Sequence, residues 1–219
     1  MGAPILPMPE HVRRSVAEAM NCPDSRDTRG LPELRAAIAE ELSREHGLRV
    51  DPERRLLITH GAMQGLSIVL RTVLAPGDEV IVPTPTFFFD GAIRESGAIP
   101  AYVPSRESEG WALDPARFEA AITARSRAVL LCNPNNPTGY LPDAATLAAV
   151  VDLVARHGLL ILCDESWQHF TYDGRRYQPV ETFADRWPHI VTITSLSKYY
   201  ALASWRSATS WRRRRSSTR

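Results

Sequence analysis

Short apolar runs alternate with helical patterns along most of this 219-residue chain, and this alternation most constrains its fold. The runs are continuously apolar rather than alternating with polar residues, which indicates strands buried on both faces of a mainly parallel sheet. We expect strands near residues 56–59, 79–83, 101–104, 128–133, 159–165 and 190–195. The sequence therefore predicts an α/β fold with three layers, in which helices cover both faces of the sheet.

The segments between these runs have helical spacing and recognisable ends. Pro9 begins an early helix, and a second helix with an apolar face over residues 31–42 should end at Gly47. Another helix follows Gly61, and a longer one over residues 143–157 should end at Gly158. We find no internal repeat.

The use of basic residues is strongly uneven, because 25 of the 26 are arginine and the one lysine of the whole chain is Lys198. A chain that uses arginine for every other cation has little structural reason for one exception. Arginine cannot replace an amine that must lose its proton, as in Schiff-base chemistry. Lys198 is therefore a candidate for covalent chemistry.

Neither membrane insertion nor a metal site is indicated by the sequence. No stretch reaches the roughly 20 apolar residues that span a bilayer, and the proline-rich start does not resemble a signal peptide, so we expect a cytoplasmic protein. The three cysteines, Cys22, Cys132 and Cys163, show no Cys-x-x-Cys spacing, and the last two lie in apolar runs. They suggest buried thiols and neither a disulfide framework nor a zinc site.

Ligands of open α/β sheets bind beyond the carboxyl ends of the strands, so the residues that follow each apolar run are the informative ones. These are His-Gly-Ala-Met at 60–63, Pro-Thr-Pro-Thr-Phe at 83–87, Asn-Pro-Asn-Asn-Pro-Thr-Gly at 133–139, Asp-Glu at 164–165 and Ser-Leu-Ser-Lys at 195–198. In this order they resemble the class I and II aminotransferases, which are pyridoxal-phosphate (PLP) enzymes of fold type I. The resemblance extends to Gly-Leu-Pro-Glu-Leu-Arg at 30–35, to the segment 2–11, and to Arg206, eight residues after Lys198.

The resemblance implies a role for individual residues. Lys198 would hold PLP as a Schiff base and act as the general base, and Asp164 would keep the pyridine nitrogen protonated. Asn136 would donate to the phenolic oxygen of the ring, Phe87 would stack on the ring, and Trp167 would contact it. The phosphate would be bound by Gly61, Ala62, Met63, Ser195 and Arg206. Gly2 and Asn136 would contact the substrate.

Several assignments have a structural alternative. Asp164 could cap a helix, the Asn-Pro-Thr-Gly segment could be a plain turn, and Phe87 could be a core aromatic. Gly61 could be needed only for the conformation of a turn between a strand and a helix. Two positions also depart from the family pattern. Trp167 stands where many members have a tyrosine, and its indole can donate but not accept a hydrogen bond. Ser25 replaces a tyrosine that reaches the phosphate of the partner subunit.

The chain is expected to contain most of one domain and an unusual tail. Residues 1–206 would form an incomplete PLP-binding large domain, and residues 207–219 an Arg/Ser-rich tail that is aberrant or disordered. The segment from Arg206 to Arg219 contains six arginines and no acid, and removing it changes the net charge from +1 to −5. A basic run can bind nucleic acid. We favour a frameshifted or truncated gene over a nucleic-acid partner, because a shifted reading frame can restore the apolar strand that the family has here.

The sequence thus predicts an aminotransferase that moves an amino group between an amino acid and a 2-oxo acid, as a homodimer. As an incomplete chain, it is expected to lack measurable transamination by itself. A lyase or decarboxylase on the same scaffold is the nearest alternative, since PLP supports these reactions too. The alternative outside the enzymes is a non-catalytic remnant, which binds PLP or no ligand.

Overall fold

The computed structural model describes residues 7–21 and 27–212. Its strands are β1 (Leu56–Thr59), β2 (Glu79–Thr84), β3 (Ile99–Pro104), β4 (Ser126–Cys132), β5 (Leu160–Asp164), β6 (Ile190–Ser195) and β7 (Ala208–Trp211). Its α-helices are α1 (Glu10–Ala19), α2 (Pro32–His46), α3 (Ala62–Val73), α4 (Asp90–Glu95), α5 (Pro115–Ala121), α6 (Ala144–Arg156) and α7 (Leu196–Tyr199). Short 3-10 helices cover η1 (Glu107–Glu109), η2 (Val180–Phe183) and η3 (Ala203–Trp205).

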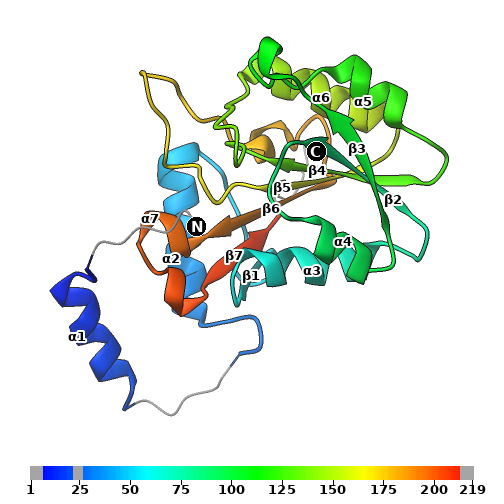
Figure 1. Ribbon diagram of the computed structural model, residues 1–219. Helices are drawn as coiled ribbons and strands as arrows, with labels where there is room; N and C mark the ends of the chain where they lie inside the picture. The colour runs from blue at the N-terminus through cyan, green and yellow to red at the C-terminus, as the bar shows by residue number, and fades with distance from the viewer. Residues whose placement is uncertain (1–6, 22–26, 213–219) are drawn as a thin grey trace, which may run out of the picture.

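The seven strands form one sheet in the order β1-β7-β6-β5-β4-β2-β3. Strands β6, β5, β4, β2 and β3 pair in parallel, while β7 is antiparallel to both of its neighbours. The prediction of an α/β fold with a mainly parallel sheet is confirmed, and all six expected strands are present. Figure 1 shows helices on both faces of this sheet, with α3 and α4 on one face and α5 and α6 on the other.

The two faces of the sheet have separate cores because successive side chains of a strand point to opposite sides. In β4, Val129 and Leu131 pack with α5 and α6, whereas Ala128 and Leu130 pack with α3 and α4. A third cluster packs α2 against β1 and β7 through residues such as Ile38, Leu42 and Trp211. The continuous apolar runs therefore reflect burial on both faces, as the sequence indicated.

The start of α2 is held by a buried arginine. The side chain of Arg35 is fully buried and donates to the backbone oxygen of Pro52, to Asp27 at 2.9 Å and to both carboxylate oxygens of Glu53 at 3.0 Å. Burial of a guanidinium is tolerated when its donors are satisfied in this way. Helix α1, in contrast, buries none of its residues and stands apart from the sheet in Figure 1.

The structure differs from the sequence interpretation at the C-terminal end. An aberrant or disordered tail was expected from residue 207, whereas Ala208–Trp211 form β7 between β1 and β6. All four residues of this strand are buried. Residues 213–219 lie outside the described part of the chain.

Two further features concern the thiols and the helices. Cys132 and Cys163 are both free and buried, as their apolar surroundings predicted. Among the helices of the described residues, none is both long and apolar enough to cross a membrane.

Candidate active site

The carboxyl ends of six strands, β1 to β6, lie at one edge of the sheet. Cys132 at the end of β4 pairs with Asp164 at the end of β5, and Asp164 pairs with Ile193 in β6. Across β7, Ala208 faces both Ser195 at the end of β6 and Thr59 at the end of β1. The segments after β1, β2, β4, β5 and β6 therefore begin at the same edge, where parallel sheets bind their ligands.

Lys198 lies in α7, which starts directly after β6. The hydroxyl oxygen of Ser195 caps this helix by accepting a hydrogen bond from the backbone N–H of Ser197 at 3.1 Å. The Nζ atom of Lys198 lies 4.8 Å from the centroid of the Trp167 ring, which is the geometry of a cation–π contact. Burial lowers the pKa of Lys198, and the charge of Arg206 acts in the same direction, while the charge of Asp164 opposes both.

Asp164 is a buried carboxylate at the end of β5, with 8% of its surface exposed. Its Oδ1 atom accepts hydrogen bonds from the backbone N–H of Ser166 at 2.9 Å and from the hydroxyl of Ser166 at 2.5 Å. Burial raises the pKa of Asp164, whereas the bonds from Ser166 and the charge of Lys198 lower it. A cation placed against this carboxylate would favour its ionised form.

The turn between β1 and α3 brings Gly61 against Arg206. Gly61 has a φ of +84°, and a Cβ atom added there would lie 2.2 Å from Nη2 of Arg206. Ala62 and Met63 are the first residues of the 12-residue helix α3, whose leading N–H groups point out of the helix. The absent side chain of Gly61 thus lets a guanidinium reach a helix N-terminus, and this combination suits an anion.

The loop after β4 is tied to the loop after β2 through Asn135. The Asn135 side chain accepts a hydrogen bond from the hydroxyl of Thr86 at 2.9 Å and donates to the backbone oxygen of Pro85 at 3.0 Å and to Thr138 at 2.7 Å. Asn136, the residue expected to face the cofactor, follows directly and is half-buried. The structural role of Asn135 is not visible in the sequence, although the residue lies in the Asn-Pro-Asn-Asn-Pro run.

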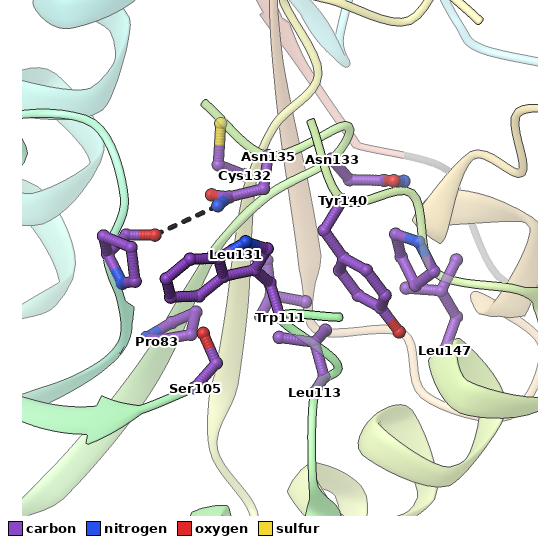
Figure 2. A pocket seen from close by; sticks show the side chains of 12 residues that line it. Pro83, Ser105, Trp111, Leu113, Leu131, Cys132, Asn133, Asn135, Tyr140 and Leu147 are labelled. Carbon is purple, nitrogen blue, oxygen red and sulfur yellow. Dashed lines mark hydrogen bonds between the residues drawn. The ribbon is translucent and has the colours of Figure 1, made fainter. Parts of the chain in front are cut away.

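A pocket lies under this loop, and Leu147 of α6 contributes to its lining. Figure 2 shows the rings of Trp111 and Tyr140 facing each other across this pocket, with Leu113 below them and Asn135 above. Asn133 and Asn135 line this pocket together with the two rings, so the loop that carries Asn136 borders it.

Phe87 belongs to a row of three phenylalanines with different burial. Its ring centroid lies 5.6 Å from that of Phe89, which is 1% exposed, and 5.5 Å from that of Phe88, which is 85% exposed. Phe87 itself is partly buried and packs on the core beside α3 and α4. Phe89 is the core aromatic of this row, which leaves the Phe87 ring available at the edge.

A buried polar cluster behind Asp164 had no counterpart in the sequence interpretation. Glu165 accepts a hydrogen bond from the backbone N–H of Val180 at 2.9 Å, and Asn133 donates to the backbone oxygen of Gln178 at 3.0 Å. Burial raises the pKa of Glu165 to about 7, although Tyr177, Val180 and Asn133 act in the opposite direction. Glu165 Oε2 and the Tyr177 hydroxyl have no hydrogen bond of normal geometry among the described residues, so burial dominates.

Several expected site residues thus share one edge, and two fall outside the described chain. Lys198, Asp164, Trp167 and Arg206 interact with one another directly or through their charges, and Gly61 contacts Arg206. Gly2, expected to contact substrate, and Ser25, the replaced tyrosine, lie outside the described residues.

The donor set fits the cofactor that the resemblance implies. PLP needs an amine for its aldehyde, a carboxylate for its ring nitrogen, and cationic and N–H donors for its phosphate. The edge offers Lys198, the buried Asp164, and Arg206 beside the α3 N-terminus. The missing side chain of Gly61 leaves the space that the Arg206 guanidinium occupies beside this helix N-terminus.

Comparisons with known proteins agree with this arrangement. The family model "Aminotransferase class I and II" matches residues 6–209. A probable aspartate/prephenate aminotransferase of Thermus aquaticus is 35% identical over 208 residues, which cover 94% of this chain and 53% of that protein. An aspartate aminotransferase of Pyrococcus abyssi is 30% identical over 218 residues, which cover 96% of this chain and 56% of that protein.

Solved structures lead to the same family. The aromatic aminotransferase from Pyrococcus horikoshii OT3 superposes with a TM-score of 0.93 at 30% identity, over 97% of this chain and 58% of that chain. The Thermus thermophilus aspartate aminotransferase with maleate gives a TM-score of 0.90 at 32% identity, and the match covers 97% of this chain and 56% of that chain. The chain spans about half the length of the curated relatives it matches. By sequence and by fold, it belongs to the class I and II aminotransferase family.

Proposed function

We propose that this protein is a PLP-dependent aminotransferase that moves an amino group between an amino acid and a 2-oxo acid. The observation that carries the proposal is the position of Lys198, the one lysine of the chain, which lies within electrostatic reach of the buried Asp164 and of Arg206. Bound PLP would supply the electron sink for the substrate's α-carbon. We further propose that residues 1–206 act as the cofactor-binding large domain.

Lys198 would hold the cofactor covalently and, once released by a substrate amine, would take the α-proton. An amine does this only when it is uncharged. Burial and the nearby charge of Arg206 both lower the pKa of Lys198, which increases its uncharged fraction at neutral pH. The Trp167 ring under Nζ would limit the directions in which the amine can move.

Asp164 would keep a proton on the ring nitrogen. Its hydrogen bonds to Ser166 fix one carboxylate oxygen and stabilise the ionised form. In a buried site the attraction between this carboxylate and a protonated ring nitrogen is stronger than in water. The position of Asp164 at the end of a central strand would make this contact rigid.

The remaining residues would bind and orient the cofactor. Gly61, Ala62, Met63, Ser195 and Arg206 would hold the phosphate, while Asn136 and Trp167 would donate to the phenolic oxygen and Phe87 would stack on the ring. Gly2 and Asn136 are proposed to contact the substrate. We also expect a homodimer located in the cytoplasm, on the basis of the family resemblance.

The proposal is tested by cofactor labelling and by product analysis. Protein saturated with PLP is reduced with borohydride and digested, and the pyridoxyl group is expected on the Lys198 peptide. Lys198→Ala, folded by circular dichroism, is the control that should remain unlabelled. A folded, PLP-saturated protein without this label would exclude the assignment.

Product analysis then separates the reaction types. Aspartate, glutamate and aromatic amino acids are suitable donors because the names of the relatives include aspartate and aromatic aminotransferases. An aminotransferase converts the donor to its 2-oxo acid and leaves the cofactor aminated. Release of CO₂ or of the side-chain fragment would instead indicate a decarboxylase or a lyase.

A further inference from the structure

Two carboxylates and one imidazole converge beside the proposed cofactor site, in a pocket that Ser195 also lines. Glu41 and Glu45 lie one turn apart on α2, and His169 comes from the segment after β5. One ligand atom from each of the three residues lies within 4.8 Å of the others. Ligands bound to one Zn²⁺ at about 2.1 Å would be roughly 3.4 Å apart, so small side-chain rotations would complete the site.

Aromatic and amide groups already orient these side chains. The His169 ring is stacked on Tyr199 with centroids 3.8 Å apart and planes at 21°, and the amide nitrogen of Gln168 lies 3.2 Å from its Nε2 atom. With the amide turned by 180°, its oxygen would accept from Nε2–H and leave Nδ1 of His169 for the ion. The hydroxyl of Tyr200 donates to Oε1 of Glu41 at 2.7 Å. Such outer contacts fix the geometry of ligands in metal sites.

The same pocket contains polar atoms without partners among the described residues. Glu41, Glu45, His46, His169 and Thr209 all line it. Thr209 is 1% exposed and its Oγ1 atom makes no hydrogen bond. Nε2 of His46 also makes none, and it lies 4.0 Å from Oε2 of Glu45. A metal ion with its bound water would give these buried groups partners.

We propose that Glu41, Glu45 and His169 bind a divalent transition-metal ion, with His46 or a water completing the coordination. A mixed set of carboxylate and imidazole ligands suits Zn²⁺, whereas Mg²⁺ and Ca²⁺ prefer oxygen ligands alone. The ion would also relieve the repulsion between two carboxylates one turn apart, of which Glu45 is only weakly paired, with the exposed Arg44 at 3.5 Å. No metal-binding motif is visible in the sequence, because His169 is distant from α2 in the chain.

The position of this site gives it a consequence for the proposed cofactor site. His169 follows Trp167 by two residues and stacks on Tyr199, which is adjacent to Lys198. Figure 1 shows α2 beside α7, and the Tyr200–Glu41 hydrogen bond joins the two. A metal bound here would fix the segments that carry Trp167 and Lys198 to α2.

The proposal is tested by titrating cofactor-free protein with Zn²⁺ in an isothermal calorimeter, so the result does not depend on PLP binding or turnover. Saturable binding of about one ion per chain is expected. Glu41→Gln and His169→Gln should each weaken binding at least about tenfold. The matched controls are Glu40→Gln, on the exposed side of the same helix, and His157→Gln, a histidine elsewhere on the surface.

Thermal unfolding supplies a second readout in case a variant is destabilised. Zn²⁺ should raise the unfolding temperature of the wild type and of both controls equally, and should raise that of Glu41→Gln and His169→Gln clearly less at the same Zn²⁺ concentration. The absence of Zn²⁺ binding by folded wild-type protein would overturn the proposal. Equal binding by the site variants and the controls would overturn it as well, because the ion would then bind elsewhere.

Discussion

The guanidinium of Arg206 occupies the space that a side chain on Gly61 would need. A Cβ atom at residue 61 would lie 2.2 Å from Nη2 and 2.9 Å from Cζ of Arg206, and Gly61 has a positive φ of 84°. Arg206 itself has a φ of 51°, in the left-handed region. Two residues far apart in the chain, both with a positive φ, therefore fit together in size at the proposed phosphate site.

Replacing Gly61 by alanine should separate cofactor binding from folding. The added methyl group would displace Arg206 and remove a charge-assisted contact worth about 1.5–3 kcal/mol, so PLP affinity should fall roughly 10- to 100-fold. The backbone of residue 61, with a φ of 84° and a ψ of 156°, lies in a region that is essentially restricted to glycine, so alanine should cost about 1–3 kcal/mol of stability in addition. Absorbance titration with PLP measures the first effect, and urea unfolding measures the second.

Gly77→Ala is the matched control for this variant. Gly77 has a φ of 88°, similar to that of Gly61, but no atom lies within 4 Å of a Cβ atom placed there. This variant should lose comparable stability and keep its PLP affinity. A Gly61→Ala protein that binds PLP as tightly as Gly77→Ala would remove Arg206 from the phosphate site.

Asp164→Asn is expected to slow proton abstraction while leaving the shape of the site intact. Loss of a charge aimed at a buried reacting group costs at least about 10²-fold in rate. Asp164→Glu should retain part of the rate because the charge remains. The measurement is exchange of the donor's α-proton for solvent deuterium, followed by nuclear magnetic resonance.

Asp152→Asn is the control for the loss of a carboxylate. Asp152 lies in α6 and forms an exposed ion pair with Arg186 at 3.0 Å. Its exchange rate should equal that of the wild type. Exchange by Asp164→Asn at the wild-type rate would exclude the role proposed for Asp164.

The sequence predicts those parts of the fold and of the candidate site that a short stretch of residues identifies by itself. The strands of the sheet core are continuous apolar runs, and Lys198 is unique, so both are visible residue by residue. Strand β7 was missed because Ala208, Thr209 and Ser210 are not apolar enough to suggest a buried strand. Its burial comes from neighbours on both sides, β1 and β6, and no local pattern records them.

Side-chain clusters are harder to predict than strands. The contact of Glu41 and Glu45 with His169 joins residues from separate elements, and so does that of Asn135 with Thr86. The sequence identifies the residue types but not which of them meet. By contrast, Asp164 and Lys198 were found because each directly follows a strand of a parallel sheet.

Arg35→Lys should destabilise the fold much more than Arg44→Lys. Arg35 is fully buried and its planar guanidinium bonds both oxygens of Glu53 as well as Asp27, a pattern that an ammonium group cannot reproduce. Arg44 is 69% exposed and forms an ion pair with Glu45 at 3.5 Å. Urea unfolding should show a large fall in midpoint for Arg35→Lys and almost none for Arg44→Lys. Equal midpoints would mean that the Arg35 network contributes no stability.

The pH dependence of stability should report the buried Glu165. Burial raises its pKa from 4.5 to about 7 in the folded protein, so the folded state binds this proton more tightly than the unfolded chain. Stability is therefore lost as the pH rises from about 4.5 to about 7, by on the order of 3 kcal/mol for this group. Glu165→Gln has no proton to lose, and its amide oxygen can still accept from the N–H of Val180.

Relative to the wild type, Glu165→Gln should therefore gain stability between pH 5 and pH 8. Urea unfolding at both pH values measures the gain, and the difference between the two proteins cancels the titration of all other groups. Glu40→Gln, an exposed control, should follow the wild type at both pH values. If the difference between Glu165→Gln and the wild type is the same at pH 5 and pH 8, Glu165 is already ionised in the folded protein at pH 5. The contacts with Tyr177 and Asn133 would then outweigh burial.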